Sequence, residues 1–124
     1  MQQFFQDEVN PTDDELVRWA YSGALEPYED FDIVIADPEH LDTLVKLVAD
    51  PDCPTREYLL GSLYCTIGHS DLADPRIDAA VQTALGSADP WVARCAERVR
   101  RLLAEPATRV RDDWCGWQGL RKTP

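Results

Sequence analysis

The chain has 124 residues and a formal net charge of −11, because 12 Lys and Arg face 23 Asp and Glu. Its length predicts one domain, residues 1–124, and its hydrophobic content of 44% is sufficient for a folded core, which excludes wholesale disorder. The negative charge also disfavours direct binding of nucleic acid, since a phosphate backbone is attracted to basic surfaces.

The acidic residues are concentrated in the first third of the chain. Residues 1–42 contain 12 acidic residues and one basic residue, whereas residues 94–124 contain four acidic and eight basic residues. Such an asymmetry predicts either an oriented partner surface or attraction between the two ends of the molecule.

The N-terminal segment, residues 1–36, is predicted to contain a helix over residues 12–25. Thr12 and Glu15 have the spacing of a capping box, in which each side chain accepts a hydrogen bond from the other residue's backbone N–H. Residues 31–36 are ambiguous, because their β-branched side chains suit a strand while their apolar spacing also fits a helix. We favour a short helix or an extended packed segment over a strand.

Asp-Pro dipeptides mark the helix boundaries of the central segment. They begin at Asp37, Asp50, Asp74 and Asp89. Asp is a good N-cap and Pro is favoured at the first helical position, so three of the pairs predict the starts of helices over residues 38–49, 75–86 and 90–104. Asp50-Pro51 instead closes a helix, because proline disfavours helical geometry in the preceding residue. With a further helix predicted over residues 54–68, the predicted fold class is all-α.

The four helices between residues 37 and 104 form two similar pairs. A shift of 36 positions superimposes apolar residues of the first pair on those of the second, for example Leu41 on Ile77 and Leu63 on Val99. A repeat built from two helices in this way resembles the HEAT and armadillo families of helical repeats. The resemblance implies antiparallel helix hairpins in a short stack, and the alternative is an irregular five-helix bundle.

The C-terminal tail, residues 105–124, is basic and contains Trp114 and Trp117. We expect it to pack as an extended clasp across the open end of the helical stack, since two exposed indoles would promote aggregation. The alternative is that the two tryptophans anchor a partner.

Neither a metal site nor a catalytic centre is predicted. The closest cysteines in the sequence are Cys53 and Cys65, whereas structural zinc sites take ligands from close pairs; Cys65 and His69 have helical i, i+4 spacing, but no second pair accompanies them. His40 and His69 are expected at the surface. Cys115 alone has basic neighbours, and no histidine near it in the sequence could act as its base. We therefore expect no metal, no cofactor and no enzymatic activity.

Aromatic residues are interleaved with acidic ones between residues 19 and 32, which is typical of a surface that binds a basic protein. The predicted partner-binding residues are Tyr28, Glu26, Glu29, Asp30 and Asp32, together with Asp13 and Asp14 of the first predicted helix. The alternative is that Trp19 and Phe31 belong to the core and that the acids form a solvated surface.

The function we expect is that of a non-enzymatic protein-binding module, since stacked helices present surfaces. In size, charge and helicity the chain is similar to immunity proteins that neutralise toxins of bacterial competition systems, which implies an antagonist that masks a basic toxin or nuclease. The alternatives are a scaffolding domain that binds through an apolar groove and an enzyme with Cys115 as nucleophile. No signal peptide or membrane span is predicted, so we expect a cytoplasmic protein without a membrane partner.

Overall fold

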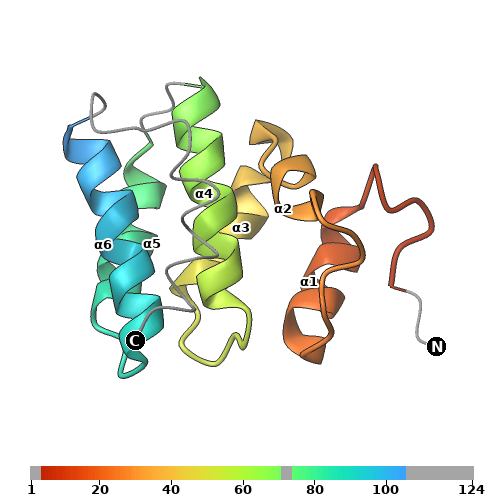
Figure 1. Cartoon of the computed structure of the whole chain (residues 1–124), viewed down its shortest axis with the longest axis horizontal. Helices are drawn as coiled ribbons and strands as arrows, with labels where there is room; N and C mark the ends of the chain where they lie inside the picture. The colour runs from red at the N-terminus through yellow and green to blue at the C-terminus, as the bar shows by residue number, and fades with distance from the viewer. Residues whose placement is uncertain (1–3, 71–73, 106–124) are drawn as a thin grey trace.

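The computed structural model describes residues 4–70 and 74–105, and within these ranges every regular element is a helix (Figure 1). The elements are α1 (Asp13–Ser22), α2 (Phe31–Val34), the 3₁₀ turn η1 (Pro38–His40), α3 (Leu41–Ala49), α4 (Arg56–Ser70), α5 (Pro75–Leu85) and α6 (Pro90–Ala104). The all-α class is confirmed. Residues 31–36, which were ambiguous in the sequence, contain the short helix α2. The predicted clasp and Cys115 lie outside the described residues.

The capping box at the start of α1 is present. Thr12 Oγ1 accepts a hydrogen bond from the Glu15 backbone N–H at 3.2 Å, and Glu15 Oε1 accepts one from the Thr12 N–H at 3.0 Å. The helix ends at Ser22 and not at the predicted residue 25, because Gly23 adopts a left-handed conformation with φ of 76°. Glycine favours this conformation, which stops the helical hydrogen-bond ladder.

The Asp-Pro pairs work as the sequence predicts. The side chains of Asp37, Asp74 and Asp89 each accept a hydrogen bond from the backbone N–H two residues further on, in each case at 2.9 Å. Asp50 closes α3 in an extended conformation. Further predicted boundaries are wrong. The helix predicted to start at residue 38 begins as the 3₁₀ turn η1 and is α-helical only from Leu41, and α4 begins at Arg56, after Pro54, and continues past residue 68 to Ser70.

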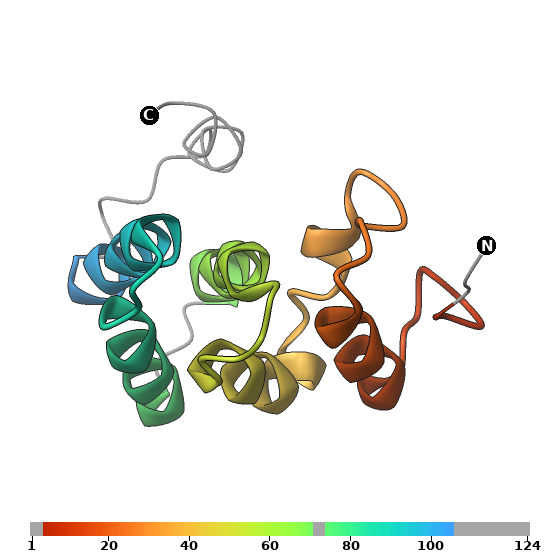
Figure 2. The same ribbon diagram turned by 90° about the horizontal axis from the view of Figure 1, so that it is seen from below.

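The helices of residues 38–104 lie in two layers (Figure 2). Helices α3 and α5 pack side by side in one layer and α4 and α6 pack in the other, while α3 contacts α4, and α5 contacts α6, across the layers. At the N-terminal end, α1 packs against α3 and α2 packs against α4. Leu41 and Leu63, and the residues that coincide with them after the shift, Ile77 and Val99, are buried.

Helix α4 lies at the centre of this arrangement, and each residue from Leu59 to Ile67 is buried. Because no side of this stretch faces water, its polar side chains need partners inside the protein. The Ser62 hydroxyl donates to the Asp32 carbonyl at 3.0 Å, and the Thr66 hydroxyl donates to the Ala36 carbonyl at 2.6 Å. These two bonds attach α2 and the residues after it to α4.

We predict that replacing Thr66 with Val lowers the free energy of unfolding by about 1–3 kcal/mol, because the buried Ala36 carbonyl loses its donor while the side-chain volume stays the same. Urea denaturation measures the change. The control is Thr83→Val, since the Thr83 hydroxyl bonds to the Ala79 carbonyl of its own helix at an exposed position. Equal losses in the two variants would contradict the role of the Thr66 hydroxyl in attaching α2.

Candidate functional site: acidic surfaces of the N-terminal third

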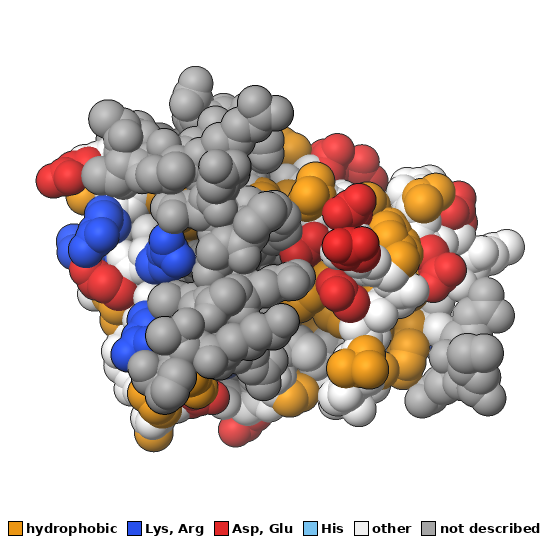
Figure 3. Space-filling view, viewed as in Figure 1, with side chains coloured by type: hydrophobic (Ala, Val, Ile, Leu, Met, Phe, Trp, Pro, Cys, Tyr) orange, Lys and Arg blue, Asp and Glu red, His pale blue; other side chains and the backbone are white. Residues whose placement is uncertain are grey.

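The seven predicted partner-binding residues are divided between two places. Asp13 and Asp14 are exposed on the first turn of α1, whereas Glu26, Tyr28, Glu29 and Asp30 lie in the loop before α2, and Asp32 lies within α2. In Figure 3 acidic side chains gather among hydrophobic ones over the α1 and α2 end of the molecule, whereas the Lys and Arg side chains that are visible lie over the α6 end, with some acidic side chains beside them. The charge asymmetry of the sequence is therefore also an asymmetry in space.

The aromatic residues between α1 and α2 form part of the core. Trp19 and Phe31 are 2% and 0% exposed, and their rings meet edge to face with centroids 5.1 Å apart. Tyr58 of α4 and Phe5 complete the cluster, at 5.4 Å from Trp19 and 5.1 Å from Phe31. For Trp19 and Phe31 the alternative interpretation of the sequence is confirmed, because neither ring is available to a partner.

Tyr28 is half-buried at the edge of this cluster. Its ring packs against Phe31 with centroids 5.7 Å apart, and its hydroxyl donates to the Glu8 carbonyl at 2.8 Å. Glu26 is also partly engaged, because the Tyr58 hydroxyl donates to its carboxylate at 2.6 Å. Burial, together with this hydrogen bond, raises the pKa of Tyr58 and keeps its proton in place as the donor. In the loop this leaves Glu29 and Asp30 as the exposed carboxylates.

Asp32 is 4% exposed, so its carboxyl group faces the interior instead of a partner. Its Oδ1 accepts a hydrogen bond from the Ile33 backbone N–H at 2.9 Å. Burial, followed by the charges of Glu26 and Asp30, raises the pKa of Asp32 from 3.8 to about 7, although the Ile33 hydrogen bond acts in the opposite direction. Near neutral pH the protonated and ionised forms of Asp32 therefore coexist.

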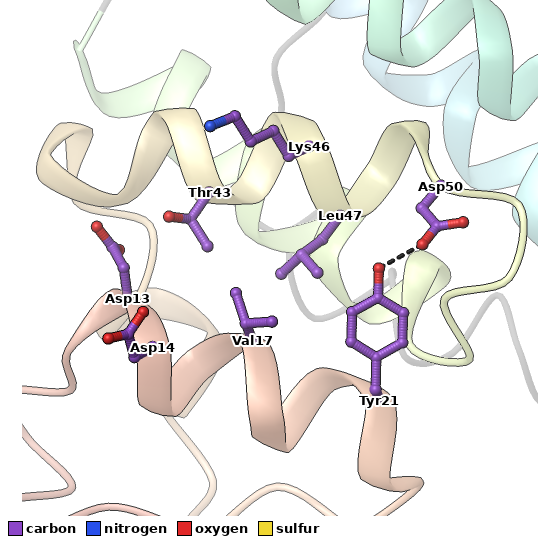
Figure 4. Close-up of a pocket in the computed structure, with 8 residues that line it drawn as sticks. All are labelled: Asp13, Asp14, Val17, Tyr21, Thr43, Lys46, Leu47 and Asp50. Atoms are coloured by element: carbon purple, nitrogen blue, oxygen red, sulfur yellow. Dashed lines mark hydrogen bonds between the residues drawn. The ribbon is translucent and has the colours of Figure 1, made fainter.

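Helices α1 and α3 enclose a groove with a volume of about 330 Å³ (Figure 4). Val17 of α1 and Leu47 of α3 face one another in its middle, Asp13 and Asp14 lie at one end, and the Tyr21 hydroxyl donates to the Asp50 carboxylate at the other. The complete lining is Asp13, Asp14, Val17, Tyr21, Thr43, Lys46, Leu47 and Asp50. Of these residues, only Asp13 and Asp14 were predicted from the sequence as partner-binding residues.

A hydrogen bond and an ion pair engage charged side chains of this groove. His40 Nδ1 lies 2.8 Å from Asp13 Oδ1, and Lys46 Nζ lies 2.8 Å from Asp42 Oδ2. His40 is 5% exposed, so its predicted surface position is wrong; it is buried because η1 places it under the start of α1, where Asp13 satisfies one ring nitrogen. The Lys46 charge is compensated by Asp42, and the groove is acidic at both ends.

The far end of the groove is held by the hydrogen bond between Tyr21 and Asp50. This bond raises the pKa of Tyr21 to about 12 and lowers that of Asp50. Asp50 therefore stays ionised and Tyr21 stays protonated throughout the neutral range. The two residues are 29 positions apart, and the sequence offered only the i, i+4 spacing of Val17 and Tyr21 as a signal for this surface.

Among the described residues, the cysteines, the metal-ligating side chains and the length of the helices bear on other kinds of function. Cys53, Cys65 and Cys95 are buried. No three His, Cys, Asp or Glu side chains come together to hold a metal ion in the described part of the chain. Across the same residues, no helix combines the length and the apolar character that crossing a bilayer requires.

We predict that the contribution of Asp32 to stability falls as the pH rises from about 4 towards 8, because the raised pKa of Asp32 means that folding favours its protonated form. Asp32→Asn keeps an acceptor for the Ile33 N–H but cannot ionise. The variant should therefore be more stable than the wild type at about pH 8, with a smaller difference at about pH 5. Urea denaturation over this range measures both profiles.

The matched control is Asp30→Asn, which removes the same charge from an exposed neighbour. It should leave most of the pH dependence in place. If Asp32→Asn and the wild type lost stability in parallel, Asp32 would not be the titrating group.

Comparison with known proteins identifies no relative: no protein-family model, no curated protein and no solved structure matches this chain. The resemblances to HEAT and armadillo repeats and to immunity proteins therefore stay predictions.

Proposed function

We propose that this protein is a non-enzymatic protein-binding module whose acidic N-terminal third contacts the basic surface of a partner protein. The observation that carries the proposal is the separation of charge in Figure 3, with acids over α1 and α2 and basic residues over α6. A basic partner is attracted to one end of such a molecule and repelled by the other, so the complex has one orientation.

The exposed carboxylates of the loop before α2 support this function. Within the described part of the chain, Glu29 and Asp30 form no ion pair, so their charges are not neutralised internally. The loop itself is held on the core through Tyr28 and through the bond between Tyr58 and Glu26. Carboxylates on an anchored loop bind with less loss of conformational entropy than carboxylates on a free one.

The more specific form of the proposal is an immunity-type antagonist that acts in the cytoplasm and masks a basic toxin or nuclease. Its support is analogy in size, charge and helical content. The second candidate is a scaffolding domain that binds through an apolar groove, and the apolar middle of the α1–α3 groove, formed by Val17 and Leu47, favours it. Salt distinguishes the two, since screening weakens charge-driven association and leaves apolar association intact.

We predict that affinity capture from a lysate of the source cells with the full chain as bait retains a basic protein at low salt and releases it as salt is added. The double variant Glu29→Gln with Asp30→Asn should retain at least about tenfold less of it, because two steering charges are lost. Mass spectrometry identifies the retained protein, and quantitative blotting compares the baits.

The control bait carries Asp52→Asn with Asp78→Asn, which removes the same charge from the exposed surface of the α3–α4 loop and of α5. It should behave as the wild type does. If the amount of captured protein changed neither with added salt nor with the double variant of Glu29 and Asp30, the result would contradict the proposal and favour the scaffolding function.

A further inference from the structure

We infer that the α1–α3 groove is the docking site for an arginine side chain of the basic partner. The inference rests on the proposed function and specifies which part of the partner the groove accepts. Its volume of about 330 Å³ lies at the lower end of the range for ligand sites, which suits one long side chain better than a packed helix.

The walls of the groove match the aliphatic part of such a side chain. Val17 and Tyr21 are 37% and 45% exposed, and they face Leu47, which is buried in the floor. The Tyr21 hydroxyl donates a hydrogen bond to Asp50, which favours the orientation of the ring along the groove. An arginine stem laid along this channel would cover apolar surface that is otherwise in contact with water.

The end of the groove at Asp13 and Asp14, beside the N-terminus of α1, matches the guanidinium group. Asp13 uses one carboxylate oxygen for His40, and Asp14 is exposed with no ion pair among the described residues. A carboxylate in this position can accept two parallel hydrogen bonds from a guanidinium, whereas an ammonium offers only a point charge. The charge of Lys46 on the opposite wall is compensated by Asp42 and does not repel the incoming cation at full strength.

One arginine side chain covers part of the length of the groove. Asp14 and Tyr21 lie seven positions apart on α1, which corresponds to about 10 Å along the helix axis. An extended arginine side chain reaches about 7 Å, so a side chain that enters near Val17 reaches Asp14, whereas one that enters beside Tyr21 stops short of it. Asp50 at the other end of the groove adds to its negative potential.

The test uses a blocked pentapeptide of Gly and Ser with one central Arg, and matched peptides with norleucine or Lys in its place. Methyl NMR of the full chain at low ionic strength follows the Val17 and Leu47 resonances. The Arg peptide should shift both saturably with a dissociation constant on the order of millimolar, because only one side chain is bound. The norleucine peptide should give no saturable shift, and the Lys peptide should bind more weakly.

Asp14→Asn should weaken binding of the Arg peptide at least about threefold, whereas Asp78→Asn on α5 should leave it unchanged. The inference is overturned if the Arg peptide gives no saturable shift up to about 20 mM, if norleucine or Lys binds as well as Arg, or if Asp14→Asn binds as the wild type does. The capture experiment with Glu29 and Asp30 is independent of these peptides. A negative result with the peptides therefore overturns only the arginine site, whereas a negative result in the capture experiment overturns the proposed function.

Discussion

The burial of residues 59–67 of α4 on all sides is the constraint on which the rest of the structure depends. A helix without a wet face can keep serine and threonine only if other elements supply their acceptors. Ser62 and Thr66 find these acceptors in the carbonyls of Asp32 and Ala36, and this fixes α2 at one place along α4. Because the acidic loop directly precedes α2, its position is fixed together with that of α2. The buried hydroxyl groups of Ser62 and Thr66 therefore determine where the exposed carboxylates of this loop lie.

Burial also sorts the acidic residues by role. Asp32 follows Phe31 into the core and becomes a titratable interior group, while Glu29 and Asp30, only two or three positions earlier, stay in water. Asp13 and Asp14 belong to a different surface, where α1 and α3 lie side by side. An acidic segment that looks uniform in the sequence therefore supplies an internal proton site, an exposed loop and one end of a groove.

Local chemistry made much of the fold predictable. The helix starts were predictable from the capping box of Thr12 and Glu15 and from the Asp-Pro pairs, because the hydrogen bonds of these caps join residues only two or three positions apart. The end of α1 at Gly23 was readable from the sequence, because glycine after a helix is a local stop signal. The burial of His40 was not, since it depends on how α1 meets η1 and α3. The same reason applies to the groove, whose walls come from helices about 30 positions apart: no local pattern encodes such a pairing, and only packing reveals it.

The position of the Asp32 pKa near 7 means that the charge of the domain is not a fixed whole number under ordinary conditions. A positive surface that approaches the α2 end stabilises the ionised form and lowers this pKa, so the carboxyl group gives up part of its proton. If the proposed basic partner binds at this end, its association is coupled to proton release from Asp32, and the net charge of the domain becomes more negative. The heat of association consequently depends on the ionisation enthalpy of the buffer, and this dependence reports on the core through an event at the surface.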